Sequence, residues 1–276
     1  MQDNMLSLGL KIGLGSPRVR NTGFAPSDIS NLDLHYDFST LTGSNGDAVS
    51  SFANAGGGGS SYNLSQSTGG SQPTLNTSEL SLNSVDFASG DFLELGSNYT
   101  TTGETFTIFV VYEVDATADI DTFMAGDSGA INQFGVYNHK NVTTRFNGNE
   151  GAGSLNAIEY IRTDQTTQDA GYGGSATSTT AYTLTADPEI LVVTRDASSN
   201  KEIRIYNKNK ALIGLSSSPS GAASDTNFLI GQLGRQAGGG GTTAGVIGEL
   251  GLYNKTLTVS EVNQVIDYLT SKWSIS

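Results

Sequence analysis

The end of the chain, residues 246–276, constrains the fold more than any other part. Residues 246–254 have the apolar character of a β-strand, and residues 258–273 follow the 3.6-residue period of an amphipathic helix. The apolar positions of this helix are Val262, Val265, Ile266, Leu269 and Trp273. They recur three or four residues apart and therefore form one stripe, which predicts a helix that buries a single face.

The start of this helix carries its own signals. Thr258 and Glu261 fit the capping box, in which each side chain bonds a backbone N–H group that the first helical turn leaves unpaired. Leu257 and Val262 stand at the two positions of a hydrophobic staple. No other segment is as clear a helix, so we expect a β-rich chain that ends in one helix.

The rest of the chain has the pattern of a succession of strands. Short β-branched and aromatic runs alternate with segments rich in Gly, Ser, Thr and Asn. They predict strands at residues 32–38, 84–87, 92–95, 105–114, 122–125, 133–137, 156–162, 182–184, 190–195, 203–207, 211–215, 227–231 and 246–253. Residues 106–112 and 190–194 are continuously apolar, which predicts central strands covered on both faces. The glycine runs 56–59 and 238–241 are predicted to be loops within one domain.

Composition excludes several classes of function. The chain has 276 residues, a formal net charge of −13 and no cysteine. Its acidity argues against nucleic-acid partners, whose binding depends on Lys and Arg, and the lack of cysteine rules out disulfides and thiolate chemistry. We find neither the roughly 18 consecutive apolar residues of a membrane span nor a signal-peptide pattern. We therefore expect synthesis in a cytoplasm without signal-directed export, and no membrane insertion.

Residues 1–30 differ in character from residues 31–276 and are predicted to form an N-terminal arm. Five apolar residues alternate with small or basic ones, which would give a strand one continuous apolar face. The residues that we expect to dock are Leu6, Leu8, Leu10, Lys11, Ile12, Leu14, Arg18 and Arg20. Two interpretations remain open: a first strand of the same sandwich, or an anchor that adds to the sheet of a partner.

Several segments, taken in order, resemble the concanavalin A-like superfamily in its laminin-G-like form. Residues 32–38 resemble its opening strand, and residues 46–52 and 72–74 resemble the approach to the second strand. Residues 85–95 resemble a Val-x-Phe element of the family, and residues 247–254 with the helix resemble its closing segment. The resemblance covers residues 31–276 and implies an all-β, antiparallel jelly-roll sandwich with a C-terminal helix.

The superfamily includes glucanases, but the sequence predicts no enzyme. Their strand motif E-x-D-x-x-E places catalytic carboxylates on one face. The nearest match begins at Glu113 and Asp115 and has Ala118 where the third carboxylate belongs. His35 and His139 are the two histidines of the chain, and we interpret both as strand or turn residues because no G-x-S-x-G nucleophile motif accompanies them.

Two kinds of binding site remain as alternatives. Calcium would suit the carboxylates of Asp86, Asp91, Glu94, Asp127, Asp196 and Asp225, but none lies in a D-x-D-x-D-G loop, so we predict solvated side chains and no cofactor. A glycan could stack on aromatic residues that lie in or near Gly-rich loops, namely Tyr137, Tyr172 and Tyr182. Trp273 belongs to the apolar stripe of the helix and is expected in the core.

An apolar arm ahead of such a domain resembles structural proteins of tailed phages. The sequence therefore favours a non-enzymatic virion protein, a capsid decoration or a surface fibre. Its arm would bind other virion proteins or sister subunits. The alternative function is a carbohydrate-binding lectin or adhesin that attaches to host or surface glycans.

Overall fold

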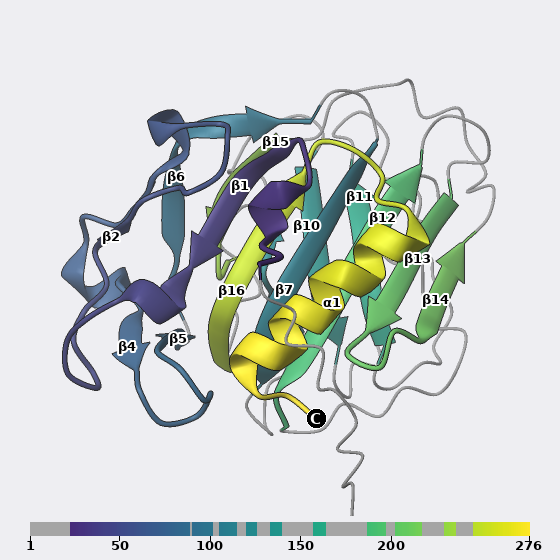
Figure 1. Ribbon diagram of the computed structural model, residues 1–276. Coiled ribbons are helices and arrows are strands. Elements are labelled where there is room, and N and C mark those ends of the chain that lie inside the picture. The colour runs from purple at the N-terminus through teal and green to yellow at the C-terminus, as the bar shows by residue number, and fades with distance from the viewer. Residues whose placement is uncertain are drawn as a thin grey trace, which may run out of the picture.

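The computed structural model is a sandwich of two β-sheets with one long helix lying across it (Figure 1). It describes residues 23–88, 90–101, 105–114, 120–125, 133–139, 157–163, 187–196, 202–216, 229–235 and 245–276. Short 3-10 helices interrupt the first part of the chain: η1 (Pro26–Asp28), η2 (Phe38–Thr40), η3 (Ser60–Tyr62) and η4 (Gly69–Ser71).

The first sheet, sheet A, contains the most apolar strands. They are β1 (Leu32–Asp37), β4 (Thr74–Asn76), β5 (Ser84–Phe87), β7 (Phe106–Val114), β12 (Glu189–Asp196), β13 (Glu202–Asn207), β14 (Leu212–Ser216) and β16 (Gly245–Tyr253). Their order is β14-β13-β12-β7-β16-β5-β4, and β1 also pairs with β16. The pairings are antiparallel. The continuously apolar segments of β7 and β12 lie at its centre and are buried, as predicted.

The second sheet, sheet B, is built from shorter strands. They are β2 (Ser51–Phe52), β3 (Leu64–Ser65), β6 (Leu93–Thr100), β8 (Ile120–Thr122), β9 (Met124–Ala125), β10 (Gln133–His139), β11 (Ala157–Thr163) and β15 (Leu229–Leu233). The order is β11-β10-β15-β6-β3-β2, with β8 on β10 and β9 on β15. β10 and β15 run parallel at one register position, and the other described pairs are antiparallel.

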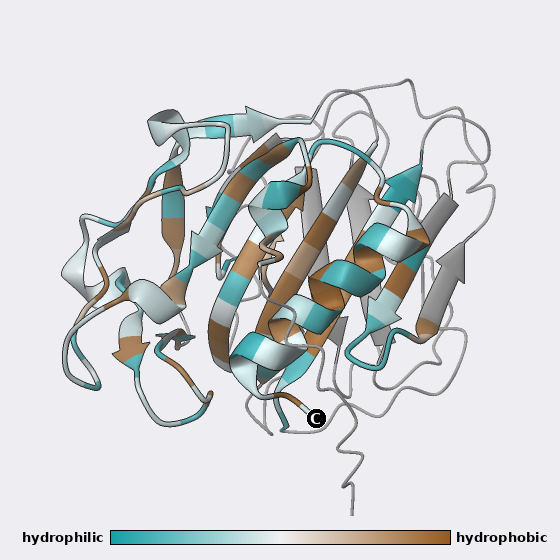
Figure 2. Cartoon of the chain, viewed as in Figure 1, coloured by the Kyte–Doolittle hydropathy of each residue, from teal (hydrophilic) through white to brown (hydrophobic). Residues whose placement is uncertain are grey.

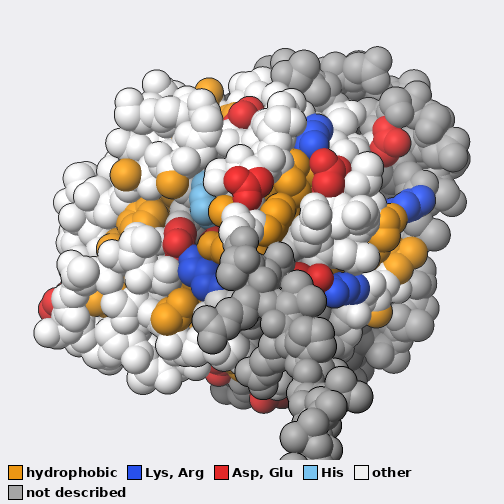
Figure 3. Space-filling model, in the orientation of Figure 1, with side chains coloured by type: hydrophobic (Ala, Val, Ile, Leu, Met, Phe, Trp, Pro, Cys, Tyr) orange, Lys and Arg blue, Asp and Glu red, His pale blue; other side chains and the backbone are white. Residues whose placement is uncertain are grey.

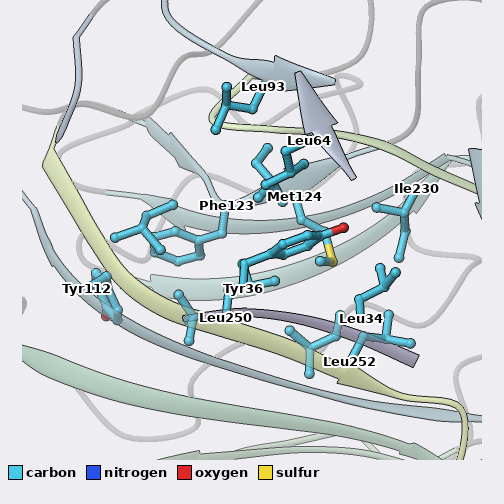
Figure 4. Close-up of a cluster of buried hydrophobic side chains, with 14 of the residues drawn as sticks. Leu34, Tyr36, Leu64, Leu93, Tyr112, Phe123, Met124, Ile230, Leu250 and Leu252 are labelled. Atoms are coloured by element: carbon cyan, nitrogen blue, oxygen red, sulfur yellow. The ribbon is translucent and has the colours of Figure 1, made fainter. Parts of the chain in front are cut away.

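The main core fills the space between the two sheets. Because successive strand residues point to opposite faces, each strand contributes alternate side chains. Figure 4 shows this packing, with Leu34, Tyr36, Tyr112, Leu250 and Leu252 from sheet A against Leu64, Leu93, Met124 and Ile230 from sheet B, and Phe123 from between β8 and β9.

A second core lies on the other side of sheet A, beneath the helix α1 (Val259–Trp273). The predicted stripe of this helix is buried in full, and it packs on outward-facing residues such as Phe109 and Val111 of β7 and Ile190 and Val192 of β12. Figure 2 shows the matching pattern, with hydrophobic colour along most of β7 and hydrophilic bands on α1. Sheet A is therefore covered on both faces.

The predicted cap of α1 is present. The Glu261 N–H donates to Thr258 Oγ1 at 3.3 Å, and the Thr258 N–H donates to Glu261 Oε2 at 2.8 Å. Lys255 Nζ lies 2.8 Å from Glu261 Oε1. Leu257 and Val262 are both buried in the second core, as expected for a staple. The helix is thus fixed at the point where it leaves β16.

The glycine run 56–59 forms a loop that lies directly on β1. Asn54 Oδ1 accepts the backbone N–H groups of His35 and Gly56, at 2.8 and 3.0 Å, and its Nδ2 donates to the Asp33 carbonyl at 2.9 Å. A Cβ atom on Gly56 would lie 2.3 Å from that carbonyl oxygen, so only glycine permits this approach. The loop prediction is confirmed here, and the run at 238–241 lies outside the described residues.

Residues 23–31 join the sandwich on its helix-covered side. Pro26 and Ile29 are buried, and the Phe24 ring meets the Tyr268 ring edge-on, with centroids 6.2 Å apart. The Tyr253 hydroxyl donates to the Pro26 carbonyl at 2.8 Å. The predicted arm, residues 1–30, therefore has its last part packed on the domain, and residues 1–22 lie outside the described residues.

The predicted fold class is confirmed: two antiparallel sheets with one C-terminal helix. The sequence did not predict β2, β3 and β4, which have two or three residues each and too few apolar positions to show a period. The predicted strand at 122–125 is two strands, β8 and β9. The predicted strand at 182–184 lies outside the described residues. Within the described ranges, no helix has the length and apolar character needed to cross a membrane.

Candidate functional site

The structure brings few of the predicted site residues together. Tyr137 lies in β10, where its backbone pairs with Glu159 and Thr122, and only the backbone of this strand is described. Tyr172 and Tyr182 lie outside the described residues, as do the arm residues predicted to dock: Leu6, Leu8, Leu10, Lys11, Ile12, Leu14, Arg18 and Arg20. The glycan-binding and docking assignments of these residues stay predictions.

The best candidate in the described part of the chain is the outer face of sheet B. This face lies on the side of the molecule away from α1, since sheet A and the main core separate the two. Alternation along β6 sends Leu93 and Leu95 into the core and Glu94 outward. Register places Ser65 of β3 and Gln232 of β15 on either side of Glu94. A polar row therefore crosses three neighbouring strands.

An arginine stacked on an aromatic ring stands beside this row. The guanidinium carbon of Arg235 lies 3.3 Å from the centre of the Phe92 ring. Its Nε and Nη2 groups donate to Gln232 Oε1 at 3.3 and 2.9 Å. Nη2 also lies 3.8 Å from Glu94 Oε1. The stack and the paired bonds fix the plane of the guanidinium, which a lysine in its place could not reproduce.

Local backbone geometry explains why Arg235 stands there. Gly234 has a φ of +81°, and a Cβ atom on it would lie 2.3 Å from the Phe87 ring. Its N–H donates to the Phe123 carbonyl at 3.3 Å. Only glycine permits both the left-handed turn and the contact with the core. The chain can therefore leave β15 and return Arg235 over the sheet.

The ring beneath Arg235 is held equally firmly. The Phe92 N–H donates to the Ser71 carbonyl at 3.1 Å, and Gln66 Nε2 donates to the Phe92 carbonyl at 3.5 Å. Next to it, Asp91 is nearly buried and accepts the Ala88 N–H at 2.9 Å. Burial raises the pKa of Asp91, and the bond from Ala88 partly opposes this. The cluster is thus built on a rigid support.

The charges and exposed groups of this cluster suit polar, uncharged ligands. The Arg235 side chain is 24% exposed and the Glu94 side chain 56%, whereas Gln232 is almost fully buried. Within the described residues, Arg235 Nη1 has no hydrogen-bond acceptor. A partly exposed guanidinium and an exposed carboxylate therefore stand side by side on this face.

A second polar cluster lies under α1 and has a different character. Glu249 is fully buried, and its carboxylate accepts from Trp273 Nε1 at 3.0 Å and lies 2.7 Å from Lys272 Nζ and 2.8 Å from His35 Nε2. Lys272 Nζ also lies 2.6 Å from Asp37 Oδ1. Figure 3 looks onto this side of the molecule, where charged side chains gather around an apolar strip.

This second cluster holds the helix in place. Burial alone would lower the pKa of Lys272, but Glu249 and Asp37 outweigh it and raise that pKa, so the ammonium stays charged. The groups satisfy one another and link β1, β16 and α1. His35 is a strand residue, as predicted, and contributes a bond to Glu249. His139 lies in β10, of which only the backbone is described.

The residues considered as catalytic groups or calcium ligands, and not predicted to act as either, lie in different elements or outside the described residues. Glu113 lies near the end of β7 in sheet A, next to Val246 of β16, and Asp115 and Ala118 lie outside the described residues. Among the calcium candidates, Asp86 is in β5, Asp196 ends β12, and Asp127 and Asp225 lie outside the described residues. In the described ranges, no three His, Asp or Glu side chains gather as metal ligands would.

Sequence reasoning missed Arg235, Phe92 and Gln232. Phe92 and Glu94 were part of a predicted strand, and alternation would have placed them on one face. The separation of Glu94 from Arg235 in the sequence hides their pairing, which depends on the register of β6 with β15. The one local signal was Gly234, a glycine directly before an arginine at the end of a strand, which indicates a turn that could return the arginine over the sheet.

Comparisons with solved structures identify the same kind of sandwich in carbohydrate-active proteins. Domain 4 of an extracellular GH43 arabinanase from Geobacillus stearothermophilus, solved with arabinotriose, matches with a TM-score of 0.53 at 13% identity, over 86% of this chain and 98% of that one. An arabinofuranosidase in complex with arabinofuranosyl-α-1,2-xylobiose matches with a TM-score of 0.54 at 14% identity, over 89% of this chain.

A GH54 α-L-arabinofuranosidase gives a TM-score of 0.53 at 13% identity over 88% of this chain. This chain spans about 60% of the first arabinofuranosidase and 59% of the second. At these identities the likeness concerns the fold, a lectin-like β-sandwich. Neither a protein-family model nor a curated protein matches the sequence.

Proposed function

We propose that the domain is a non-catalytic carbohydrate-binding module that uses the outer face of sheet B. The observation that carries the proposal is the polar cluster of Arg235, Glu94 and Gln232 on that face, in which Glu94 is exposed and Arg235 partly exposed. Glycan sites combine flat side chains with fixed hydrogen-bonding groups, and the stacked guanidinium supplies both. A sandwich shared with an arabinotriose-bound arabinanase domain supports the choice of ligand class.

The proposal contains no catalytic step. A glycosidase needs two carboxyl groups roughly 5–10 Å apart across the scissile bond. Glu94 is charge-paired with Arg235, and the E-x-D segment that begins at Glu113 has no third carboxylate. We therefore expect binding without turnover.

Affinity gel electrophoresis against a set of soluble polysaccharides tests the proposal. Arabinan, xylan, mixed-linkage β-glucan and galactan are the neutral probes, and polygalacturonate and alginate are the anionic ones. We expect the full chain to be retarded by at least one neutral polysaccharide and to release no reducing sugar from it. The proposal would be overturned if the protein bound none of these polysaccharides.

A virion role is a second, independent proposal that the sequence favours. In this function the arm, residues 1–30, would dock the domain on a phage particle as a decoration or fibre protein, after synthesis in the host cytoplasm. The packing of Phe24 and Pro26 supports it, because it attaches the chain on the side away from the outer face of sheet B. An anchored domain would then present that face outward.

Deletion of residues 1–20 tests the virion role. We expect the truncated protein to stay folded, because residues 29–275 supply both described hydrophobic cores, and thermal unfolding would check this. Incorporation into particles should be lost. Normal incorporation of the truncated protein would refute docking through the arm while leaving carbohydrate binding unaffected.

A further inference from the structure

The charges of the sheet B cluster narrow the class of ligand. The planar guanidinium group of Arg235 has two faces and three edges. Phe92 covers one face, and Gln232 Oε1 accepts hydrogen bonds from the edge formed by Nε and Nη2. The side chain is 24% exposed, and the described residues take no hydrogen bond from its Nη1 group. Glu94 stands 3.8 Å from Nη2, too far for a strong hydrogen bond, and is itself more than half exposed. A pair of opposite charges is therefore open to a ligand between them.

Resting on the carbohydrate-binding function, we infer that Arg235 and Glu94 together bind a vicinal diol of a neutral sugar. One hydroxyl oxygen accepts a hydrogen bond from the guanidinium, and the neighbouring hydroxyl donates to the carboxylate. Hydrogen bonds to charged groups are stronger than neutral ones. The diol therefore adds two short hydrogen bonds to a long ion pair, and both charged groups gain a hydrogen-bond partner.

The same geometry disfavours an acidic sugar. A ligand carboxylate that approaches Arg235 also approaches Glu94, and like charges repel. The near-buried Asp91 and the net charge of −13 add to this repulsion at longer range. Glu94 thus offsets the positive charge of Arg235. The guanidinium therefore acts as a rigid hydrogen-bond donor and does not act as an anion-binding group.

Two substitutions separate this role from simple charge. Arg235→Lys keeps the positive charge but loses the stacked plane and the paired donors. Glu94→Gln keeps the shape and a hydrogen-bond acceptor but removes the negative charge. Lys210→Asn is the matched control, because Lys210 makes an exposed ion pair with Asp267 of α1 on the opposite side and has a left-handed φ of 60° that Asn tolerates.

The experiment is isothermal titration of the full chain and the three variants with arabinotriose, xylotriose, cellotriose and galactotriose, and with trigalacturonate as the anionic probe. For the neutral sugar that binds, we expect Arg235→Lys and Glu94→Gln each to weaken binding about tenfold or more. Lys210→Asn should leave the affinity for that sugar unchanged. Glu94→Gln should also bind trigalacturonate better than the natural chain does.

The outcomes distinguish the two levels of the proposal. If a neutral trisaccharide binds and both sheet B variants bind it as the natural chain does, the diol site is wrong and the module still binds carbohydrate elsewhere. If trigalacturonate binds more tightly than every neutral sugar, the inferred ligand class is wrong. If no sugar binds at all, the carbohydrate-binding function itself fails. Unfolding midpoints within about 2 °C of the natural chain would establish that the variants are folded.

Discussion

The two sheets present outer faces of opposite kind. The outer face of sheet A carries large apolar side chains such as Phe109, Val111 and Ile190, and α1 covers it. The outer face of sheet B carries Ser65, Glu94 and the stacked Arg235, of which Ser65 and Glu94 are exposed and Arg235 is partly exposed. One face therefore stabilises the domain, and the other is the proposed recognition surface.

The difference also appears in how each face treats its charges. Under α1, Glu249 is fully buried and bonded to His35, Lys272 and Trp273, so every charge has a fixed partner. On sheet B, Glu94 is exposed, Arg235 is partly exposed, and the two are only loosely paired. Charges that hold a fold satisfy one another, whereas charges that bind a ligand keep bonding capacity for it. Substitutions on the two faces test this division, from the largest expected effect to the smallest.

Among substitutions on the helix-covered face, Trp273→Ala should lower the free energy of unfolding most. The indole is almost fully buried, lies against Gly248 and donates to Glu249. Its removal leaves a cavity and takes one of two donors from Glu249 Oε2, which keeps its bond from Lys272 Nζ, and we expect a loss of about 3–5 kcal/mol in the free energy of unfolding. Urea denaturation followed by circular dichroism would measure it. A loss below about 1 kcal/mol would mean that the second core contributes little to stability.

Glu249→Gln should lower the free energy of unfolding by about 2–3 kcal/mol. The amide cannot accept from His35, Lys272 and Trp273 together, and it brings an N–H₂ group toward other donors. Chemical denaturation of the natural chain and this variant gives the difference. Sugar binding on sheet B should be unchanged as long as the variant is folded, and a loss of binding would show that the two faces are coupled.

Thr258→Ala removes half of the capping box at the start of α1. The Glu261 N–H then lacks its side-chain acceptor, and we expect a loss of about 1 kcal/mol. The unfolding midpoint measures this loss. Thr258→Ser serves as the control, because it keeps the hydroxyl acceptor and should restore most of the stability.

The same cap should give a small pH dependence. Partial burial opposes ionisation of Glu261, but bonds from Lys255 and Thr258 outweigh it, so the pKa of Glu261 is lowered. A carboxyl group with a lowered folded-state pKa stabilises the native state above its unfolded pKa of about 4.3 and loses that contribution as the pH falls. The stability difference between the natural chain and Glu261→Gln should therefore be about 0.5 kcal/mol at pH 6 and shrink toward pH 3. A constant difference would contradict it.

Glu94→Gln should be the least costly change to stability, within about 0.5 kcal/mol of the natural chain, because its pair with Arg235 is long and exposed. Thermal unfolding would measure this. The same variant is expected to weaken neutral-sugar binding strongly. A marked loss of stability would show that Glu94 stabilises the fold, as the charged residues under α1 do, and the two faces would then not differ in this respect.

The elements that the sequence predicted best are those with local signals. The stripe from Val262 to Trp273 and the Thr258–Glu261 cap depend on spacing within one helix, and both are confirmed. The continuous apolar runs of β7 and β12 likewise indicated their burial. In contrast, β2, β3 and β4 are too short to show a period, and their place depends on partners far along the chain.

The candidate site shows why function was harder to predict. Arg235 meets Phe92 only because β6 and β15 pair in a particular register, and no spacing in the sequence encodes that pairing. The tyrosines that sequence reasoning chose, such as Tyr172, were selected by their nearness to glycine-rich loops. Long-range register, and not local composition, brings the described polar cluster together.

The position of the C-terminus has a practical consequence for avidity. Ser276 is exposed just beyond α1, on the same side as residues 23–31 (Figure 1). Copies tethered to a bead or a sensor surface through this end would all point the outer face of sheet B away from the support. A polysaccharide repeats its units, so an array of parallel domains could engage many of them at once. Binding that is weak for a single domain would become strong by multivalency.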